Sequence, residues 1–295
     1  MDIIYRYDPH APLEIDSPET PQEALDRLAA GNHRFATLVE RMQNVTESPD
    51  ESESVVIPVS PLTMGIPFVS GHMLPQRPYA LVLGCSDARA PVEHIFDCGA
   101  NEIFVVRVAG NVLGLECLGS VDYAVSHLRD SLRTGVVLGH TGCGAVTATV
   151  DMYLAPRGVT NLALRHPVRS LVDRIMLAVR AAAQAFQDSG MADELPPEEY
   201  RTRLITAASF LNAAVTAFDV QREVRDLVGS DVGVAYGVYN VARSRVSALP
   251  LTDDGSSTPT FGSAPASADG LTKLAEEIAA RLRDVDRNQQ TVYLS

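Results

Sequence analysis

The chain has 295 residues, 46% of them hydrophobic, which suits one large α/β domain with appendages or two small domains. Its formal net charge of −13 argues against nucleic acid and anionic membranes as partners, because their phosphates would be repelled. No apolar stretch reads as the roughly 20 residues of a membrane helix, so no membrane span is expected. The first residues show no pattern of an export signal, and we expect a cytoplasmic protein.

The first 72 residues are expected to form an arm, a helix and an acidic loop. Residues 1–18 are typical of a poorly ordered or extended arm, whereas residues 21–38 carry apolar side chains at helical spacing. Gly31 and Asn32 are expected to break or reshape that helix. Residues 44–62 combine acidic residues with serines and prolines, which indicates a solvated loop.

The next region, residues 73–250, has the pattern of an α/β domain. Four apolar runs predict its strands, over residues 79–84, 102–108, 134–139 and 232–241. The first three lack clean alternation, which suits strands covered on both faces. Helical patterns lie between the runs, over residues 120–132 and 145–154. Alternating strands and helices predict a mostly parallel central β-sheet flanked by helices.

Long helical patterns occupy much of the rest of the chain. An apolar stripe over residues 168–186 and another over 204–218 predict two packed helices, separated by a break at residues 189–197. Residues 152–201 are taken as a long helical insert. The last segment, residues 251–295, is expected to hold a flexible linker and a short helix at 271–282.

Three metal-ligating side chains lie at the ends of two apolar runs. Cys85 follows the first run, and His140 and Cys143 follow the third. If these strands are adjacent, the side chains converge at the carboxyl edge of the sheet. Thiolate and imidazole are ligands that zinc prefers, and three protein ligands leave one coordination position open for water. The alternatives are buried structural cysteines with a core histidine, or a Cys/His nucleophile pair.

Two charged residues follow the first of these ligands. Asp87 would either bind the metal as a fourth ligand in a closed site or accept a hydrogen bond from zinc-bound hydroxide. Arg89 would decide between these roles by pairing with Asp87 and drawing it off the metal. The alternative is an ordinary surface ion pair.

The donor set also predicts a pH dependence. Two thiolates cancel the charge of Zn²⁺, whereas three neutral histidines would leave it at +2, so the bound water should be less acidic here. We therefore expect an activity that rises toward alkaline pH.

Taken together, these motifs resemble the β-class carbonic anhydrases. The matching segments are residues 85–89 (CSDAR), 95–97 (IFD), 102–111 (EIFVVRVAGN), 119–125 (GSVDYAV) and 139–145 (GHTGCGA). The resemblance runs from about Ala24 to Val246, and residues 31–35 resemble the N-terminal helix of that family.

The resemblance implies an enzyme that reversibly hydrates carbon dioxide to bicarbonate and a proton, by attack of zinc-bound hydroxide. It implies Cys85, His140 and Cys143 as zinc ligands and Asp87 with Arg89 as the catalytic dyad. The substrate pocket would be lined by residues partly supplied by a neighbouring subunit: Gln76, Phe104, Tyr123 and the backbone of Gly144. A homodimer or higher homo-oligomer is therefore implied, with the N-terminal helical arm packed on the partner subunit.

Two alternatives remain open at this point. One is a hydrolase of carbon disulfide or carbonyl sulfide on the same scaffold. The other is a non-catalytic zinc-binding regulatory protein, although such a protein would not need the Asp87 and Arg89 pair.

Overall fold

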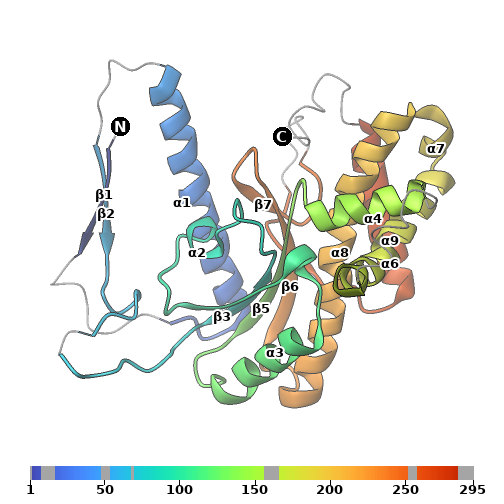
Figure 1. Ribbon diagram of the computed structural model, residues 1–295. Coiled ribbons are helices and arrows are strands. Elements are labelled where there is room, and N and C mark those ends of the chain that lie inside the picture. The colour runs from blue at the N-terminus through green and yellow to red at the C-terminus, as the bar shows by residue number, and fades with distance from the viewer. Residues whose placement is uncertain are drawn as a thin grey trace.

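The computed structural model describes residues 2–7, 17–47, 54–67, 70–155, 166–251 and 258–284 (Figure 1). Its centre is a six-stranded sheet with the order β4-β3-β5-β6-β7, in which β8 also pairs with β6. The strands are β3 (Ala80–Gly84), β4 (Ile103–Arg107), β5 (Thr134–His140), β6 (Gly233–Asn240), β7 (Arg245–Ser247) and β8 (Gly262–Ser263). The first four pair with one another in parallel, and β7 and β8 are antiparallel to β6. The prediction of a mostly parallel central sheet is confirmed.

The four predicted strands lie where the apolar runs placed them, with ends displaced by one residue. Every residue of β3 and of β5 is buried, which explains why these runs do not alternate. Leu81 and Leu83 point into one hydrophobic cluster, and Ala80 and Val82 point into another on the opposite face. The sheet therefore separates two cores, and helices cover both.

Most helices lie on one side of the sheet, together with the larger core (Figure 1). They are α3 (Leu115–His127), α4 (Gly144–Leu154), α6 (His166–Asp188), α7 (Met191–Glu194), α8 (Pro197–Val228) and α9 (Ala268–Asp284). The smaller core on the other side involves α1 (Pro21–Glu47) and the short α2 (Val92–Ile95). A short 3₁₀ turn, η1 (Ala109–Asn111), follows β4. The flanking of the sheet by helices is confirmed.

Helix α8 is more apolar than expected from the sequence. Of the described helices, it alone is long and apolar enough to cross a membrane by length and composition. However, 78% of its most apolar 18-residue stretch is buried inside the protein, where it contacts β5, β6 and several helices. That placement is typical of a core helix.

The helix near the end of the chain packs into the larger core. Ile278 and Leu282 of α9 are buried, and α9 contacts both α6 and α8. The buried guanidinium of Arg203 on α8 donates a hydrogen bond to the Leu282 carbonyl and pairs with Glu199 at 2.7 Å. The predicted helix at 271–282 is thus present and longer, whereas residues 252–257 of the predicted linker lie outside the described residues.

The expected break at Gly31 and Asn32 is wrong, because α1 continues through both residues. A side-chain carbon at Gly31 would lie 1.9 Å from the carbonyl oxygen of Phe96, so only glycine permits this approach. The Asn32 amide donates to the carbonyls of Ile95 and Ser244 and accepts from the Val246 N–H. Both residues serve tertiary contacts, which local sequence rules do not capture.

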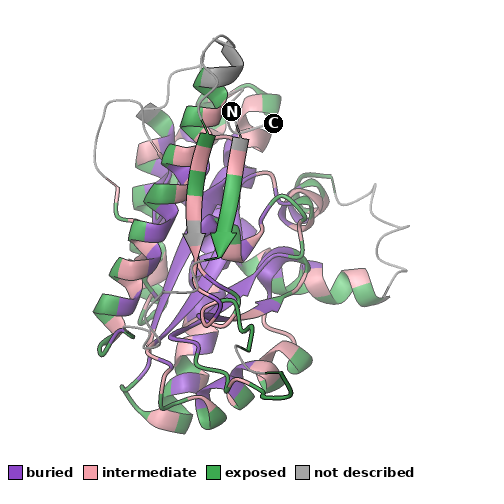
Figure 2. Ribbon diagram, turned by 90° about the vertical axis from the view of Figure 1, so that its left-hand side faces the viewer, coloured by how far each residue is buried: buried purple, intermediate pink, exposed green. Residues whose placement is uncertain are grey.

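A two-stranded parallel ribbon stands apart from the main sheet (Figure 1). It pairs β1 (Asp2–Tyr7) with β2 (Ser54–Val59). The prediction of a loop over residues 44–62 is therefore wrong for β2 and for the end of α1, while residues 48–53 lie outside the described residues. Several apolar side chains of the ribbon are exposed, including Ile4, Tyr5 and Val56. Exposed segments of the ribbon are green in Figure 2.

Candidate metal centre

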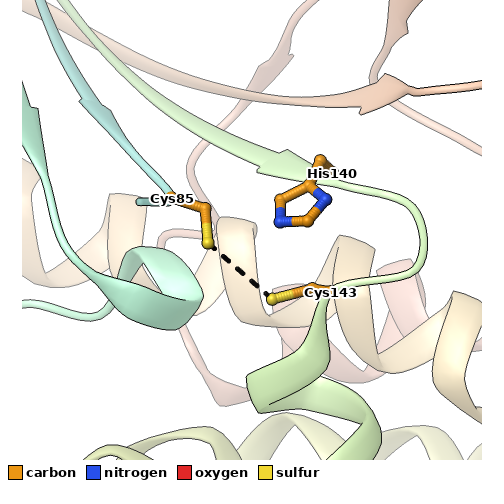
Figure 3. A group of neighbouring side chains, drawn as sticks. All are labelled: Cys85, His140 and Cys143. Atoms are coloured by element: carbon orange, nitrogen blue, oxygen red, sulfur yellow. Dashed lines mark hydrogen bonds between the residues drawn. The ribbon is translucent and has the colours of Figure 1, made fainter. Parts of the chain in front are cut away.

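The predicted convergence of Cys85, His140 and Cys143 is observed (Figure 3). Cys85 directly follows β3, His140 ends β5, and these two strands pair in parallel. Cys143 is the N-cap residue of α4. The two sulfurs lie 4.0 Å apart, and the three ligand atoms all lie within 4.8 Å of one another. All three residues are buried, so the site lies beneath the surface at the carboxyl edge of the sheet.

The imidazole of His140 has one satisfied and one unsatisfied nitrogen. Its Nδ1 lies 3.0 Å from the Thr141 carbonyl, which can only accept, so Nδ1 carries the proton. In the neutral imidazole, Nε2 is then the nitrogen that bears the lone pair. It is buried and has no hydrogen-bond partner among the described residues. An orphaned buried acceptor beside two thiols is the arrangement that a metal ion completes.

The two thiols are hydrogen-bonded to each other, with their sulfurs 4.0 Å apart. This bond lowers the pKa of Cys85, and the same bond together with burial raises the pKa of Cys143. The Gly110 N–H also donates to the Cys85 sulfur, at 3.3 Å. A thiolate is thus already favoured at Cys85, and the thiolate is the form that binds metal.

Asp87 lies beside the cluster but is held by Arg89. The Arg89 guanidinium donates to both carboxylate oxygens, at 3.1 and 2.9 Å, and the Arg89 N–H adds a bond of 2.9 Å. These hydrogen bonds lower the pKa of Asp87 to about 2, so the carboxylate is ionised. Asp87 Oδ2 lies 3.8 Å from His140 Nε2. A further bond from Arg89 to the Gly142 carbonyl, at 3.2 Å, ties the pair to the loop that carries Cys143.

Besides Gly110, two residues support the first ligand, and neither was predicted from the sequence. Arg107, the last residue of β4, donates to the carbonyls of Cys85 and Asp87 at 2.9 and 2.6 Å. Asn212 on α8 donates to the Gly110 carbonyl at 2.8 Å. All of these bonds involve backbone groups, so no spacing of side-chain types could have indicated them.

The predicted pocket residues lie in different places. Phe104 on β4 and Tyr123 on α3 contact each other, with ring centroids 6.3 Å apart, and Tyr123 is 46% exposed. Gln76 is exposed in the segment before β3. Among the described residues, no hydrogen bond or ring contact joins these three to the Cys–His–Cys cluster. Gly144 begins α4 next to Cys143, and a side chain there would meet nothing within 4 Å.

The donor set fits zinc. Two sulfurs and one imidazole nitrogen are soft or borderline ligands, whereas calcium and magnesium require oxygen. The three ligand atoms converge, and the Asp87 carboxylate lies beside them, with Oδ2 3.8 Å from His140 Nε2. The cluster is of the kind that binds zinc in β-class carbonic anhydrases.

Comparisons with known proteins point to the same family. A sequence profile described as carbonic anhydrase matches residues 80–244, more than half of the chain. The carbonic anhydrase of Mycolicibacterium smegmatis is 42% identical over 113 residues, which are 37% of this chain and 50% of that protein. Carbonic anhydrase 2 of Mycobacterium tuberculosis is 38% identical over 130 residues, 44% of this chain and 53% of that protein.

The chain thus spans about half the length of the curated relatives it matches. Among solved structures, it is similar to a Coccomyxa β-carbonic anhydrase in complex with acetazolamide, with a TM-score of 0.44 and 22% identity. That match covers 75% of this chain and 84% of the other.

Proposed function

The chain belongs to the β-class carbonic anhydrase family, and from this premise we propose that it reversibly hydrates carbon dioxide to bicarbonate and a proton. One observation carries the proposal. The buried Cys85, His140 and Cys143 converge beside an ionised Asp87 that Arg89 holds in place. A purely structural metal site would not need this carboxylate and guanidinium pair.

The residues in and around the cluster have different roles in the proposed reaction. Cys85, His140 and Cys143 would hold zinc, which would supply a Lewis acid that makes bound water more acidic than free water. Asp87 accepts a hydrogen bond from the attacking water and so fixes the direction of its lone pair. Because Arg89 occupies both carboxylate oxygens, Asp87 remains ionised and is restrained from closing onto the cluster.

The substrate is expected to lie between Asp87 and the start of α4. The Gly144 N–H belongs to the first turn of that helix, where backbone donors are free and the helix dipole favours negative charge. A bicarbonate oxygen is suited to that position. We assign Gln76, Phe104 and Tyr123 to the remaining walls of the pocket, with some of these side chains supplied by a partner subunit.

Exposed apolar surface supports a homodimer or larger homo-oligomer. Leu115 and Tyr123 on α3 are 77% and 46% exposed, and both faces of the β1–β2 ribbon carry apolar residues. An isolated two-stranded ribbon is marginally stable in water, so contact with a second copy would stabilise it. We propose that the N-terminal arm, with α1, packs on that copy. Sedimentation equilibrium tests this proposal, and a monomer at micromolar concentration would contradict it.

The central experiment measures carbon dioxide hydration by stopped flow, with zinc content determined on the same sample. We expect turnover that follows zinc occupancy. Carbon disulfide and carbonyl sulfide are tested in parallel, because their hydrolysis without hydration of carbon dioxide would favour the alternative chemistry. Zinc-loaded protein that turns over none of the three would instead be a binding protein.

A further inference from the structure

A hydrogen-bonded chain runs from α8 to the first ligand of the metal centre. Asn212, which is 2% exposed, donates from Nδ2 to the Gly110 carbonyl at 2.8 Å. Gly110 in turn donates its N–H to the Cys85 sulfur at 3.3 Å. Asn212 lies 102 residues from Gly110 in the sequence, so the link is purely tertiary.

The turn that carries Gly110 needs external support. Gly110 and Asn111 have φ values of 73° and 44°, so two consecutive residues occupy the left-handed region. For Asn111 that conformation is uncommon and costs free energy. A side-chain carbon at Gly110 would lie 2.9 Å from Ile175 and 3.0 Å from Ala145, which shows how tightly the turn is packed.

Asn212 provides this support, because its side-chain amide fixes the Gly110 carbonyl. That carbonyl belongs to the same residue as the N–H that faces the Cys85 sulfur. If the Gly110 carbonyl turned away, the strained turn could relax and the N–H would leave the sulfur. A buried carbonyl without a hydrogen-bond partner is also unfavourable, so the bond from Asn212 further stabilises this conformation of the turn.

We infer that Asn212 is a positioning residue, which keeps the Gly110 N–H directed at the Cys85 thiolate and thereby raises the affinity of the site for zinc. The inference rests on the proposed zinc site but not on turnover. A hydrogen bond to a sulfur that binds a metal is charge-assisted, and it fixes the orientation of that sulfur toward the ion. Residues that orient metal ligands in this way typically contribute about 10–100-fold in metal affinity.

The test compares Asn212→Leu, which keeps the branched shape of the side chain and removes the donor, with Ser209→Ala one turn earlier on α8. Ser209 is equally buried, but its hydroxyl bonds the Ile205 carbonyl of its own helix. Zinc affinity is measured by competition with a chromophoric chelator. Cobalt(II) is added to each protein in a separate experiment, and the thiolate-to-cobalt charge-transfer band is recorded.

We expect Asn212→Leu to lose about tenfold or more in zinc affinity, with its cobalt band moved to lower energy because the thiolate has lost a hydrogen bond. Ser209→Ala should leave both unchanged. Unchanged zinc affinity in folded Asn212→Leu would overturn the inference. So would a loss of affinity with an unmoved band, because Asn212 would then act only through the stability of the fold.

If Asn212→Leu does not fold, Asn212→Ser provides the same test, since its side chain is too short to reach the Gly110 carbonyl. Wild-type protein that binds zinc but does not hydrate carbon dioxide would refute the proposed function and leave this inference standing.

Discussion

Replacing Arg89 by alanine should release Asp87 and reduce turnover. The substitution removes both guanidinium bonds to the carboxylate and leaves only the backbone N–H of residue 89 as a donor. Asp87 Oδ2 already lies 3.8 Å from His140 Nε2, so a small rotation would bring the carboxylate into the cluster. There it would take the position needed by water, and the site would be closed.

The size of this effect follows from the exposure of the pair. A hydrogen bond to a charged group contributes about 1.5–3 kcal/mol when buried. The side chain of Arg89 is 48% exposed and that of Asp87 is 19% exposed, so solvent screening lowers the total for both bonds. We take about 1.4 kcal/mol, which corresponds to about tenfold in the population of the open arrangement.

The assay is stopped-flow hydration of carbon dioxide near neutral pH. We expect kcat/KM to fall about tenfold in Arg89→Ala at unchanged zinc content. Arg34→Ala is the control, because Arg34 forms an exposed ion pair with Asp97 at 2.6 Å outside the metal centre. If Arg89→Ala retains wild-type kcat/KM, Arg89 does not hold the carboxylate off the metal and the reasoning is refuted.

The remaining predictions concern Asp87, pH and α1. Asp87→Asn should keep its zinc, measured by atomic absorption, and lose most turnover; wild-type rates would exclude Asp87 from catalysis. Hydration should rise from neutral to alkaline pH, because two thiolates offset the charge of zinc, and a flat profile would contradict this. Pairing with Arg89 lowers the pKa of Asp87 to about 2, so the stabilisation from this pair should be lost as the pH falls from about 4 toward 2. The free energies of unfolding of wild type and Arg89→Ala, measured by urea titration, should therefore converge at low pH. A difference that stays constant with pH would refute this prediction. Gly31→Ala should destabilise by about 2 kcal/mol or more through its clash with Phe96, whereas Gly119→Ala, on a helix with open space around it, should not; equal unfolding free energies would contradict the first expectation.

The sheet could be predicted from the sequence because its central strands are buried on both faces. The runs that include Leu81 and Val137 are uninterrupted and apolar, and their burial matches that pattern. The ribbon could not be predicted in the same way. Its second strand, Ser54–Val59, contains a proline and follows acidic residues, so composition indicated a loop. Pairing between chain segments, rather than local propensity, decides that strand.

The metal ligands could also be predicted, because parallel strands place their carboxyl ends at one edge. The hydrogen bonds that support these ligands could not be predicted. Gly110 contributes a backbone N–H and Arg107 bonds backbone carbonyls, and such groups occur at every position of every sequence. At Gly31 and Asn32 the prediction of a helix break was wrong. Both residues are typical of helix ends, but here they lie inside α1 and make tertiary contacts with other parts of the chain.

The placement of the ligands also bears on how long the protein survives in a cell. Cys85 and Cys143 are 58 residues apart in the sequence, so an ion bound to both would cross-link two separate segments of the chain. Binding to the native state alone shifts the unfolding equilibrium by mass action. A shortage of zinc would therefore remove both the activity and this cross-link between chain segments. The edge of the sheet would then unfold locally more often and be exposed to proteases. The abundance of this protein would then follow the zinc supply.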